Sequence, residues 1–328
     1  MESLLFALGA IAPIIITVAI GYILKKLGLM DEKITKAANK LVFRLFLPCM
    51  LFLNVYKIGA ISDIELGYVA YAIIALLCIF IFSLPAVMAV TKIPERRGAL
   101  WQATFRSNYA LIGIPLAESL FGAKGATVAT ILSAVVVPVF NMLAVLSLSV
   151  FRRDGGKISI KSIVLGIVKN PLIQSIALGL VLLCIRALFS KYGIAFRLSD
   201  ITPIFTVLDY MSRIATPMAL LCLGAQFEFS AVSEMKREIA FGTLMRVAIV
   251  PLLGIGMAYL FFRESFNGAH FASFVAVFAT PVAVSSVPMA QEMNGDTALA
   301  GQLVVWTTLL SALSVFLVSF LLKLAGIF

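Results

Sequence analysis

The chain has 328 residues, of which 62% are hydrophobic and only 13% are charged. A soluble domain of this length needs about a quarter of its residues charged to cover its surface, so the composition excludes an ordinary soluble protein. The formal net charge of +10 requires no nucleic-acid partner, because Lys and Arg accumulate in the cytoplasmic loops of membrane proteins. Apolar runs of about 18 residues or more recur along the chain, which indicates an all-α polytopic membrane protein.

Ten membrane spans are predicted, joined by short connections. Their expected limits are 3–24, 34–56, 66–90, 99–121, 125–150, 162–189, 204–227, 238–262, 270–291 and 297–324. The connections that follow the odd-numbered spans carry roughly twice as many Lys and Arg residues as the others, which predicts that both termini lie outside a cell (inner or plasma) membrane.

Proline, glycine and arginine recur at matched spacings in the two halves of the chain. The matched sets are Pro13 and Gly21 with Pro171 and Gly179, Arg44 and Pro48 with Arg213 and Pro217, and Pro115, Glu118 and Gly122 with Pro288, Gln291 and Gly295. Each half then holds five spans, and because five is odd the second half enters the membrane inverted. We predict one repeat at 1–150, a cytoplasmic linker at 151–161 and a second repeat at 162–328. Inverted repeats are typical of secondary transporters, although channels and membrane enzymes also contain repeats.

The fourth span carries helix-breaking residues near its middle. Pro115 cannot donate a backbone hydrogen bond, and Gly113 leaves helical geometry at low cost. Freed backbone groups are tolerated in a membrane only where they face protein or a watery cavity. We therefore expect an interruption near Pro115, and a second one in span nine at Pro281 and Pro288 with Ser285 and Ser286. Two half-helix N-termini that converge at the membrane midplane would form a site for an anion.

The residues of these segments also carry a family resemblance. The pattern N-x-x-x-x-G-I-P-L occurs at Asn108, Gly113, Ile114, Pro115 and Leu116. The pattern R-x-F-x-P occurs at Arg44, Phe46 and Pro48, and the pattern M-A-x-x-x-L-G occurs at Met218, Ala219, Leu223 and Gly224. A further match in span nine is the pair Val287 and Pro288. With these motifs the chain resembles the auxin efflux carrier family, which includes the plant PIN-formed proteins, over essentially its whole length.

The resemblance implies ten transmembrane helices in two inverted repeats of five, with broken helices 4 and 9 that cross at the substrate site. This is a fold similar to sodium/proton antiporters and bile-acid symporters, and the resemblance further implies a homodimer. Family substrates are small organic anions, such as indole-3-acetate in plants and malonate or malate in bacteria. The span-nine segment departs from the family pattern by having Ser285 and Ser286 rather than an obvious asparagine. The short linker at 151–161, where the plant proteins usually have a long loop, and the compact length favour a bacterial-type carrier.

The predicted substrate-binding residues come from spans four and nine. They are Arg106, Asn108, Gly113, Ile114, Pro115, Ser285, Ser286, Val287 and Pro288. Asn108 offers two donors to a carboxylate, with a structural hydrogen bond between helices as the alternative. Arg106 offers a bidentate fork, with a structural ion pair or snorkelling as the alternative.

Four further polar residues are candidates for gating or coupling. They are Arg44, Arg213, Glu118 and Asn141. Arg44 and Arg213 occupy matched places in the two halves, which favours a structural or gating role. Glu118 would couple protons to transport if it were buried, whereas a solvated position would exclude that role.

The sequence favours a secondary transporter of small organic anions that works by alternating access. The alternative within transport is a sodium-coupled organic anion symporter of the bile-acid type, which needs a cage of polar and acidic oxygens. An enzyme is not expected, because the chain shows none of the usual protease or hydrolase motifs and contains a single histidine. No metal, cofactor or nucleotide is predicted, and the expected partners are the substrate, the lipid bilayer and a second copy of the chain.

Overall fold

A computed structural model of the chain describes residues 2–57, 65–151 and 160–328. Across these residues the structure is helical, apart from one isolated antiparallel β-bridge. Seven of the described helical segments are long and apolar enough to cross a membrane. This confirms the prediction of an all-helical polytopic protein, while the division into ten spans and two inverted repeats stays a prediction. Most of the predicted linker 151–161 lies outside the described residues.

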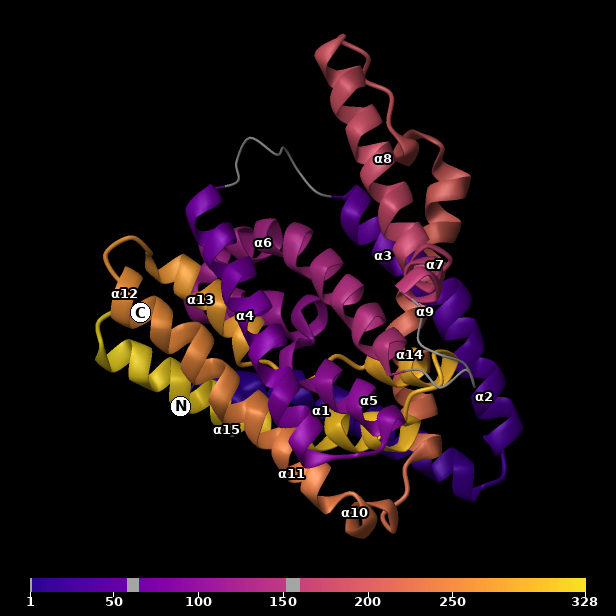
Figure 1. Cartoon of the computed structure of the whole chain (residues 1–328). Helices are drawn as coiled ribbons and strands as arrows, with labels where there is room; N and C mark the ends of the chain where they lie inside the picture. Colours follow the sequence, from indigo (N-terminus) through magenta and orange to yellow (C-terminus); the bar gives the residue numbers. More distant parts are fainter. Residues whose placement is uncertain (1, 58–64, 152–159) are drawn as a thin grey trace.

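The helices follow one another with short connections (Figure 1). They are α1 (Glu2–Lys26), α2 (Glu32–Leu41), η1 (Val42–Phe46), α3 (Leu47–Tyr56), α4 (Leu66–Val90), α5 (Pro94–Phe105), η3 (Tyr109–Gly113), α6 (Ile114–Val150), α7 (Ile160–Val168), α8 (Pro171–Lys191), η4 (Leu198–Asp200), α9 (Thr202–Gln226), α10 (Ala231–Glu234), α11 (Lys236–Leu244), η5 (Met245–Ile249), η6 (Leu252–Gly256), α12 (Met257–Phe262), α13 (Gly268–Phe278), α14 (Ser286–Glu292) and α15 (Thr297–Leu324).

The observed limits follow the predicted spans closely, with two differences. Spans four and five are joined without a loop: α6 continues through both and bends at Phe121 and Gly122, where Gly122 has a φ of +61°. A residue with a side chain rarely adopts that conformation, so glycine permits the bend. Span six, predicted as continuous, is interrupted after Val168, because the Asn170 side chain caps a new helix that begins at Pro171.

Glycines allow two helix pairs to pack closely. A Cβ added at Gly224 of α9 would lie 1.9 Å from the carbonyl oxygen of Val18 on α1, and one added at Gly21 would lie 2.2 Å from the carbonyl oxygen of Leu221. In the other pair, Gly179 of α8 lies against Val55 of α3. Gly21 and Gly179, which are matched in the sequence, therefore both allow another helix to pack closely, each in a different helix pair.

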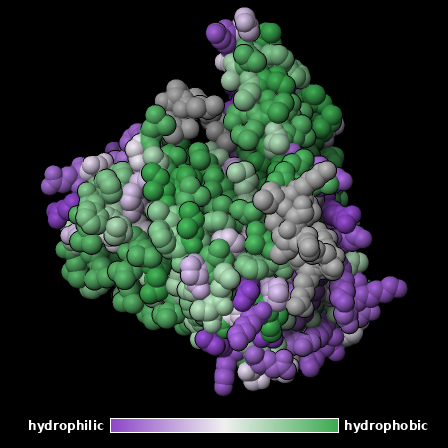
Figure 2. Space-filling model, viewed as in Figure 1, coloured by the Kyte–Doolittle hydropathy of each residue, from purple (hydrophilic) through white to green (hydrophobic). Residues whose placement is uncertain are grey.

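The surface separates into an apolar flank and a polar end. Figure 2 shows hydrophobic residues over most of the visible face, with hydrophilic residues gathered at the end of the molecule where α2 and α10 lie. Large apolar side chains such as Ile81, Phe82 and Leu260 are exposed on the flank. Exposed apolar surface of this extent is stable only against another apolar phase, which is the environment that a lipid bilayer provides.

Candidate functional site

The candidate site is built where two interrupted helices meet inside the protein. The first interruption covers residues 106–108, between the end of α5 at Phe105 and the start of η3. The second covers residues 279–285, between α13 and α14. Ser107 forms an antiparallel bridge with Val282, and the Asn108 N–H donates to the carbonyl of Pro281 at 2.7 Å. Each non-helical segment thus satisfies backbone groups of the other, as a buried interruption requires.

The first interruption lies seven residues before the predicted position at Pro115. The predicted interruption of span four is therefore present but displaced. Pro115 is the second residue of α6, which follows the π-helical turn η3 without a break. In that turn the Gly113 N–H reaches the carbonyl of Asn108 at 3.4 Å, five residues back. Such a widened turn makes room for a proline ring without ending the helix. Asn108 accordingly precedes the second half-helix, rather than lying in the last turns of the first.

The second interruption is close to its predicted place. α14 begins at Ser286, so Pro288 falls in its first turn. A proline costs little there, because the first N–H groups of a helix have no intrahelical acceptor. α14 has only seven residues, however. The macrodipole of such a short helix is small. The N-terminus of α14 therefore contributes less positive charge to the site than a long half-helix would.

A cavity of about 200 Å³ lies beside the two interruptions. It is lined by Leu47, Met50, Asn54, Asn108, Ala110, Leu111, Ala215, Thr216, Ala219, Val284 and Ser285. α3 and α9 form one wall, and the interrupted segments form the other. Among the described residues, no group accepts a hydrogen bond from the buried Nδ2 of Asn108. A buried donor without a partner is costly, so the cavity suits an occupant with hydrogen-bond acceptors.

Arg106 lies behind this cavity and is 3% exposed. One terminal nitrogen of its guanidinium donates to Asn141 Oδ1 at 2.7 Å and to Ser285 Oγ at 2.8 Å. The other lies 2.8 Å from Met289 Sδ and 3.5 Å from Ser286 Oγ. Arg106 is not among the residues that line the cavity, and Ser285 is the group that joins the two.

The positive charge of Arg106 has neutral partners only. None of the ion pairs found among the described residues includes it, and its hydrogen-bond acceptors are hydroxyls, an amide oxygen and a thioether. A charge removed from water costs several kcal/mol unless an opposite charge compensates it. This uncompensated positive charge lies directly behind Ser285, which is part of the cavity wall.

The other predicted substrate residues lie away from the cavity lining. Gly113 packs against α13, where an added Cβ would come within 3.0 Å of the carbonyl oxygen of Ala276. Ile114 is half-buried and Pro115 is exposed. Val287 and Pro288 are buried within the first turn of α14. These positions shape the helices around the site, and the structure brings only Asn108 and Ser285 of the predicted set to the cavity wall.

The gating and coupling candidates separate into different surroundings. Arg44 pairs with Glu292 of α14, with Nε and Oε2 3.4 Å apart. Arg213 pairs within its own helix with Asp209, at 2.6 Å. Glu118 is exposed on α6, a position that does not favour proton coupling. Asn141 is buried, and by accepting from Arg106 it orients the guanidinium beside the site.

Sequence reasoning missed a cluster of three amides between α2, α9 and α14. Asn39 Nδ2 donates to Gln226 Oε1 at 3.0 Å and to Gln291 Oε1 at 2.9 Å, and Gln226 Nε2 donates to Gln291 Oε1 at 3.0 Å. The three residues are far apart in sequence, and only Gln291 belongs to one of the matched sets. The available signal was the presence of polar amides inside apolar spans, where such groups need partners.

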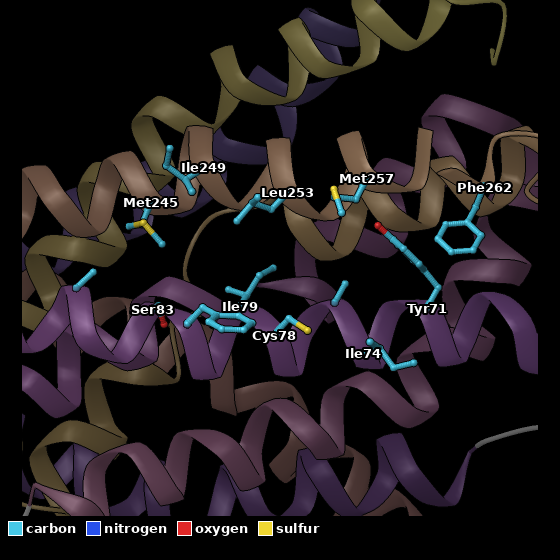
Figure 3. A pocket seen from close by; sticks show the side chains of 13 residues that line it. Tyr71, Ile74, Cys78, Ile79, Ser83, Met245, Ile249, Leu253, Met257 and Phe262 are labelled. Carbon is cyan, nitrogen blue, oxygen red and sulfur yellow. The ribbon is translucent and has the colours of Figure 1, made fainter. Parts of the chain in front are cut away.

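A second, larger pocket is unsuited to an anion. It has a volume of about 640 Å³ and lies between α4 and the segment from η5 to α12. Figure 3 shows Ile79 and Cys78 of α4 opposite Leu253 and Met257 of the other wall, without a charged side chain among the labelled residues. The exposed apolar side chains along this groove suit contact with lipid tails.

The described residues contain no group of three or more His, Cys, Asp or Glu side chains that could hold a metal ion.

A family model described as "Membrane transport protein" matches residues 6–319, a range that includes both interruptions. The chain is 23% identical over 309 residues to a protein of Methanothermobacter thermautotrophicus called "Uncharacterized transporter", covering 92% of this chain and 93% of that one. It is 26% identical over 305 residues to "Uncharacterized transporter YfdV" of Escherichia coli K12, covering 89% and 90%.

Proposed function

Because this chain belongs to the membrane transport protein family, which is the auxin efflux carrier family, we propose that it carries small organic anions across a membrane. The transported class is carboxylates such as malonate, malate or an auxin-like monocarboxylate. The substrate occupies the cavity beside the two interruptions, which open in turn to either side of the membrane by alternating access. The proposal includes a homodimer in the cell membrane, with both termini outside.

One observation carries this proposal: a buried arginine without an acidic partner stands directly behind the cavity. Arg106 holds Ser285 Oγ at 2.8 Å, and Ser285 shares the cavity wall with the unpaired amide of Asn108. A carboxylate in the cavity would accept hydrogen bonds from Asn108 and Ser285 and would compensate the charge of Arg106. A neutral or cationic substrate would leave that charge without compensation.

The sodium-coupled alternative requires a cage of oxygen ligands with negative charge. The residues known to line the cavity are apolar or carry amides and hydroxyls, without Asp or Glu. This lining supports an anion carrier, and the ion dependence of transport distinguishes the two mechanisms.

The test uses purified protein in liposomes, with labelled malonate, malate, lactate and indole-3-acetate supplied one at a time. Imposed gradients of pH, sodium and voltage are applied separately to each substrate. We expect saturable uptake of at least one carboxylate, competed by other carboxylates and unaffected by neutral amides of the same size. Uptake that depends strictly on a sodium gradient would favour the symporter, and the absence of carboxylate uptake under every gradient would reject the proposal.

The matched variants Asn108→Ala and Asn108→Asp test the site itself. Alanine removes the donors, and aspartate places a negative charge at the same position, so we expect uptake to fall in both and further in Asn108→Asp. Asn294→Asp is the control, because Asn294 lies in the exposed turn between α14 and α15. Equal uptake by Asn108→Asp and the control would remove Asn108 from the site.

A further inference from the structure

A second buried arginine, Arg246, contacts both interrupted helices at once. It lies in the π-helical turn η5 and is 0% exposed. Its Nε donates to the carbonyl of Thr280 at 2.8 Å, and one terminal nitrogen donates to the carbonyl of Val277 at 2.7 Å. The other terminal nitrogen donates to the carbonyl of Phe105 at 3.2 Å. All three nitrogens of the guanidinium are thus directed at main-chain oxygens.

These oxygens belong to the ends of two different helices. Phe105 is the last residue of α5, while Val277 and Thr280 lie in the last turn of α13 and just beyond it. The last carbonyls of a helix have no intrahelical donor and carry a partial negative charge. Arg246 satisfies carbonyls of both ends with one positive group, and none of the ion pairs found among the described residues includes it.

The two buried arginines therefore differ in what compensates their charge. Arg246 is surrounded by the negative ends of two helices, whereas Arg106 meets hydroxyls and an amide beside the cavity. The compensated charge of Arg246 has no need of a bound anion, and its donors are already used within the protein.

We propose that Arg246 is a positioning residue that joins the two interrupted helices into one rigid unit. The unit keeps Asn108 and Ser285 at a fixed separation while the wall formed by α3 and α9 moves relative to it. This inference rests on the proposed transport function for its effect on substrate. Its structural part, the joining of the two helix ends, is independent of any substrate.

The planar fork of arginine is essential to this role. It presents five N–H donors in a fixed geometry, so one side chain can reach acceptors that lie in different directions. A lysine at the same position keeps the charge but concentrates its donors on one atom. A methionine has a comparable apolar length and supplies neither charge nor donors.

The first test measures the bridge between the interruptions directly. Ser107 and Val282, which face each other across the β-bridge, are replaced by cysteines in a protein whose native cysteines are alanines. The rate of disulfide formation under mild oxidation then reports how long the two segments stay side by side. We expect the rate to be several-fold lower with Arg246→Met and intermediate with Arg246→Lys. Arg237→Met is the control, because Arg237 lies on the adjacent helix α11, is exposed, and contacts a single carbonyl at 3.3 Å.

The second test separates positioning from stability in the uptake assay. Loss of positioning raises the KM for the carboxylate, by roughly 5- to 150-fold for a typical coupling between sites. A purely structural role would instead lower the amount of active protein, and hence the maximal rate, at an unchanged KM. We expect KM to rise in the order wild type, Arg246→Lys, Arg246→Met, with Arg237→Met equal to wild type.

The two tests fail independently of each other. If wild-type protein transports no carboxylate, the proposed function is wrong and the disulfide rates still decide the role of Arg246. Wild-type disulfide rates in both Arg246 variants would overturn the inference. If Arg246→Met does not fold, Arg246→Lys alone decides: a lower rate supports the inference and a wild-type rate overturns it.

Discussion

Two arginines buried in the same membrane protein show how surroundings set the role of a residue. Arg246 reaches three main-chain carbonyls, so removing it leaves buried acceptors unpaired, each at a cost of about 1–3 kcal/mol. Arg106 reaches side chains at the edge of a cavity, and its own desolvation is uncompensated. The first arrangement stabilises the fold. In the second the charge stays uncompensated, and the anion of the proposed function would compensate it.

We therefore predict that Arg106→Met impairs transport with a small loss of stability, whereas Arg246→Met causes a larger loss of stability. Arg106→Met should abolish carboxylate uptake while lowering the thermal stability less than Arg246→Met does. A saturating carboxylate should raise the Tm of the wild type, since ligand at about 100 times its Kd adds about 2.7 kcal/mol. The same ligand should leave the Tm of Arg106→Met unchanged. Thermal unfolding in detergent with and without malonate measures both effects, and a ligand-induced shift that persists in Arg106→Met would contradict them.

The sequence singled out Arg106 and Asn108 because polar groups deep in apolar spans need a reason to be there. It could not assign their partners. Arg106 meets Ser285, which is 179 residues away, and Asn141, which the sequence placed among coupling candidates. Such contacts depend on how helices cross, and a single sequence does not contain that information.

At the scale of helices, three prolines lie next to widened turns, whereas Pro281 lies within the second interruption itself. Pro48 and Pro115 each follow a π-helical turn within two residues, and Pro251 lies between two such turns. The interruption at 106–108 has no proline, and its signal was instead the polar run Arg106, Ser107 and Asn108. Span limits, by contrast, were well predicted, as for Leu66–Val90 and Thr297–Leu324, because hydropathy over some 20 residues follows membrane thickness closely.

Close helix packing yields a prediction at this scale. Gly224→Ala should destabilise the protein by about 1–3 kcal/mol, because the new Cβ would force α1 and α9 apart. Gly67→Ala is the matched control: it lies in the first turn of α4, with no atom within 4 Å of an added Cβ. Alanine also favours helix over glycine, by about 1 kcal/mol in a helix interior, so the control should be neutral or stabilising. Thermal unfolding of both variants measures the difference, and equal stabilities would refute the packing argument.

The whole molecule contains a column of helices that stands apart from the main body at one end. Figure 1 shows α8 projecting beyond the rest of the molecule, with the first part of α9 beside it and α3 at their base. The cavity lies where α3 and α9 face the interruptions. On the side of the cavity toward α2, the amides of Asn39, Gln226 and Gln291 join α2 and α9 to α14. Toward the far end of α3, Asn54 is exposed. The hydrogen-bonded amides thus lie on one side of the cavity, and the exposed lining residue Asn54 lies on the other.

We predict that the amide cluster stabilises the conformation in which the cavity is open on the side of Asn54. Asn39→Ala removes the donor to both glutamines and should shift the population toward the state that opens on the other side. A cysteine at position 54 should then react several-fold more slowly with a membrane-impermeant maleimide than it does with Asn39 present. Asn294→Gly is the control, because Asn294 lies in an exposed turn with a φ of 57°, which glycine adopts without strain. An unchanged labelling rate in Asn39→Ala would show that the amides do not hold the closure.

The contact between the two interrupted helices is made largely through main-chain atoms. The Asn108 N–H meets the carbonyl of Pro281, and Arg246 meets three further carbonyls. Evolutionary drift at the positions that supply those carbonyls leaves the acceptors in place, since replacing a side chain does not remove its peptide oxygen. Thr216 and Ala219 of the cavity lining take no part in these main-chain contacts, so substitutions there change the shape of the cavity and leave the contact between the two segments in place.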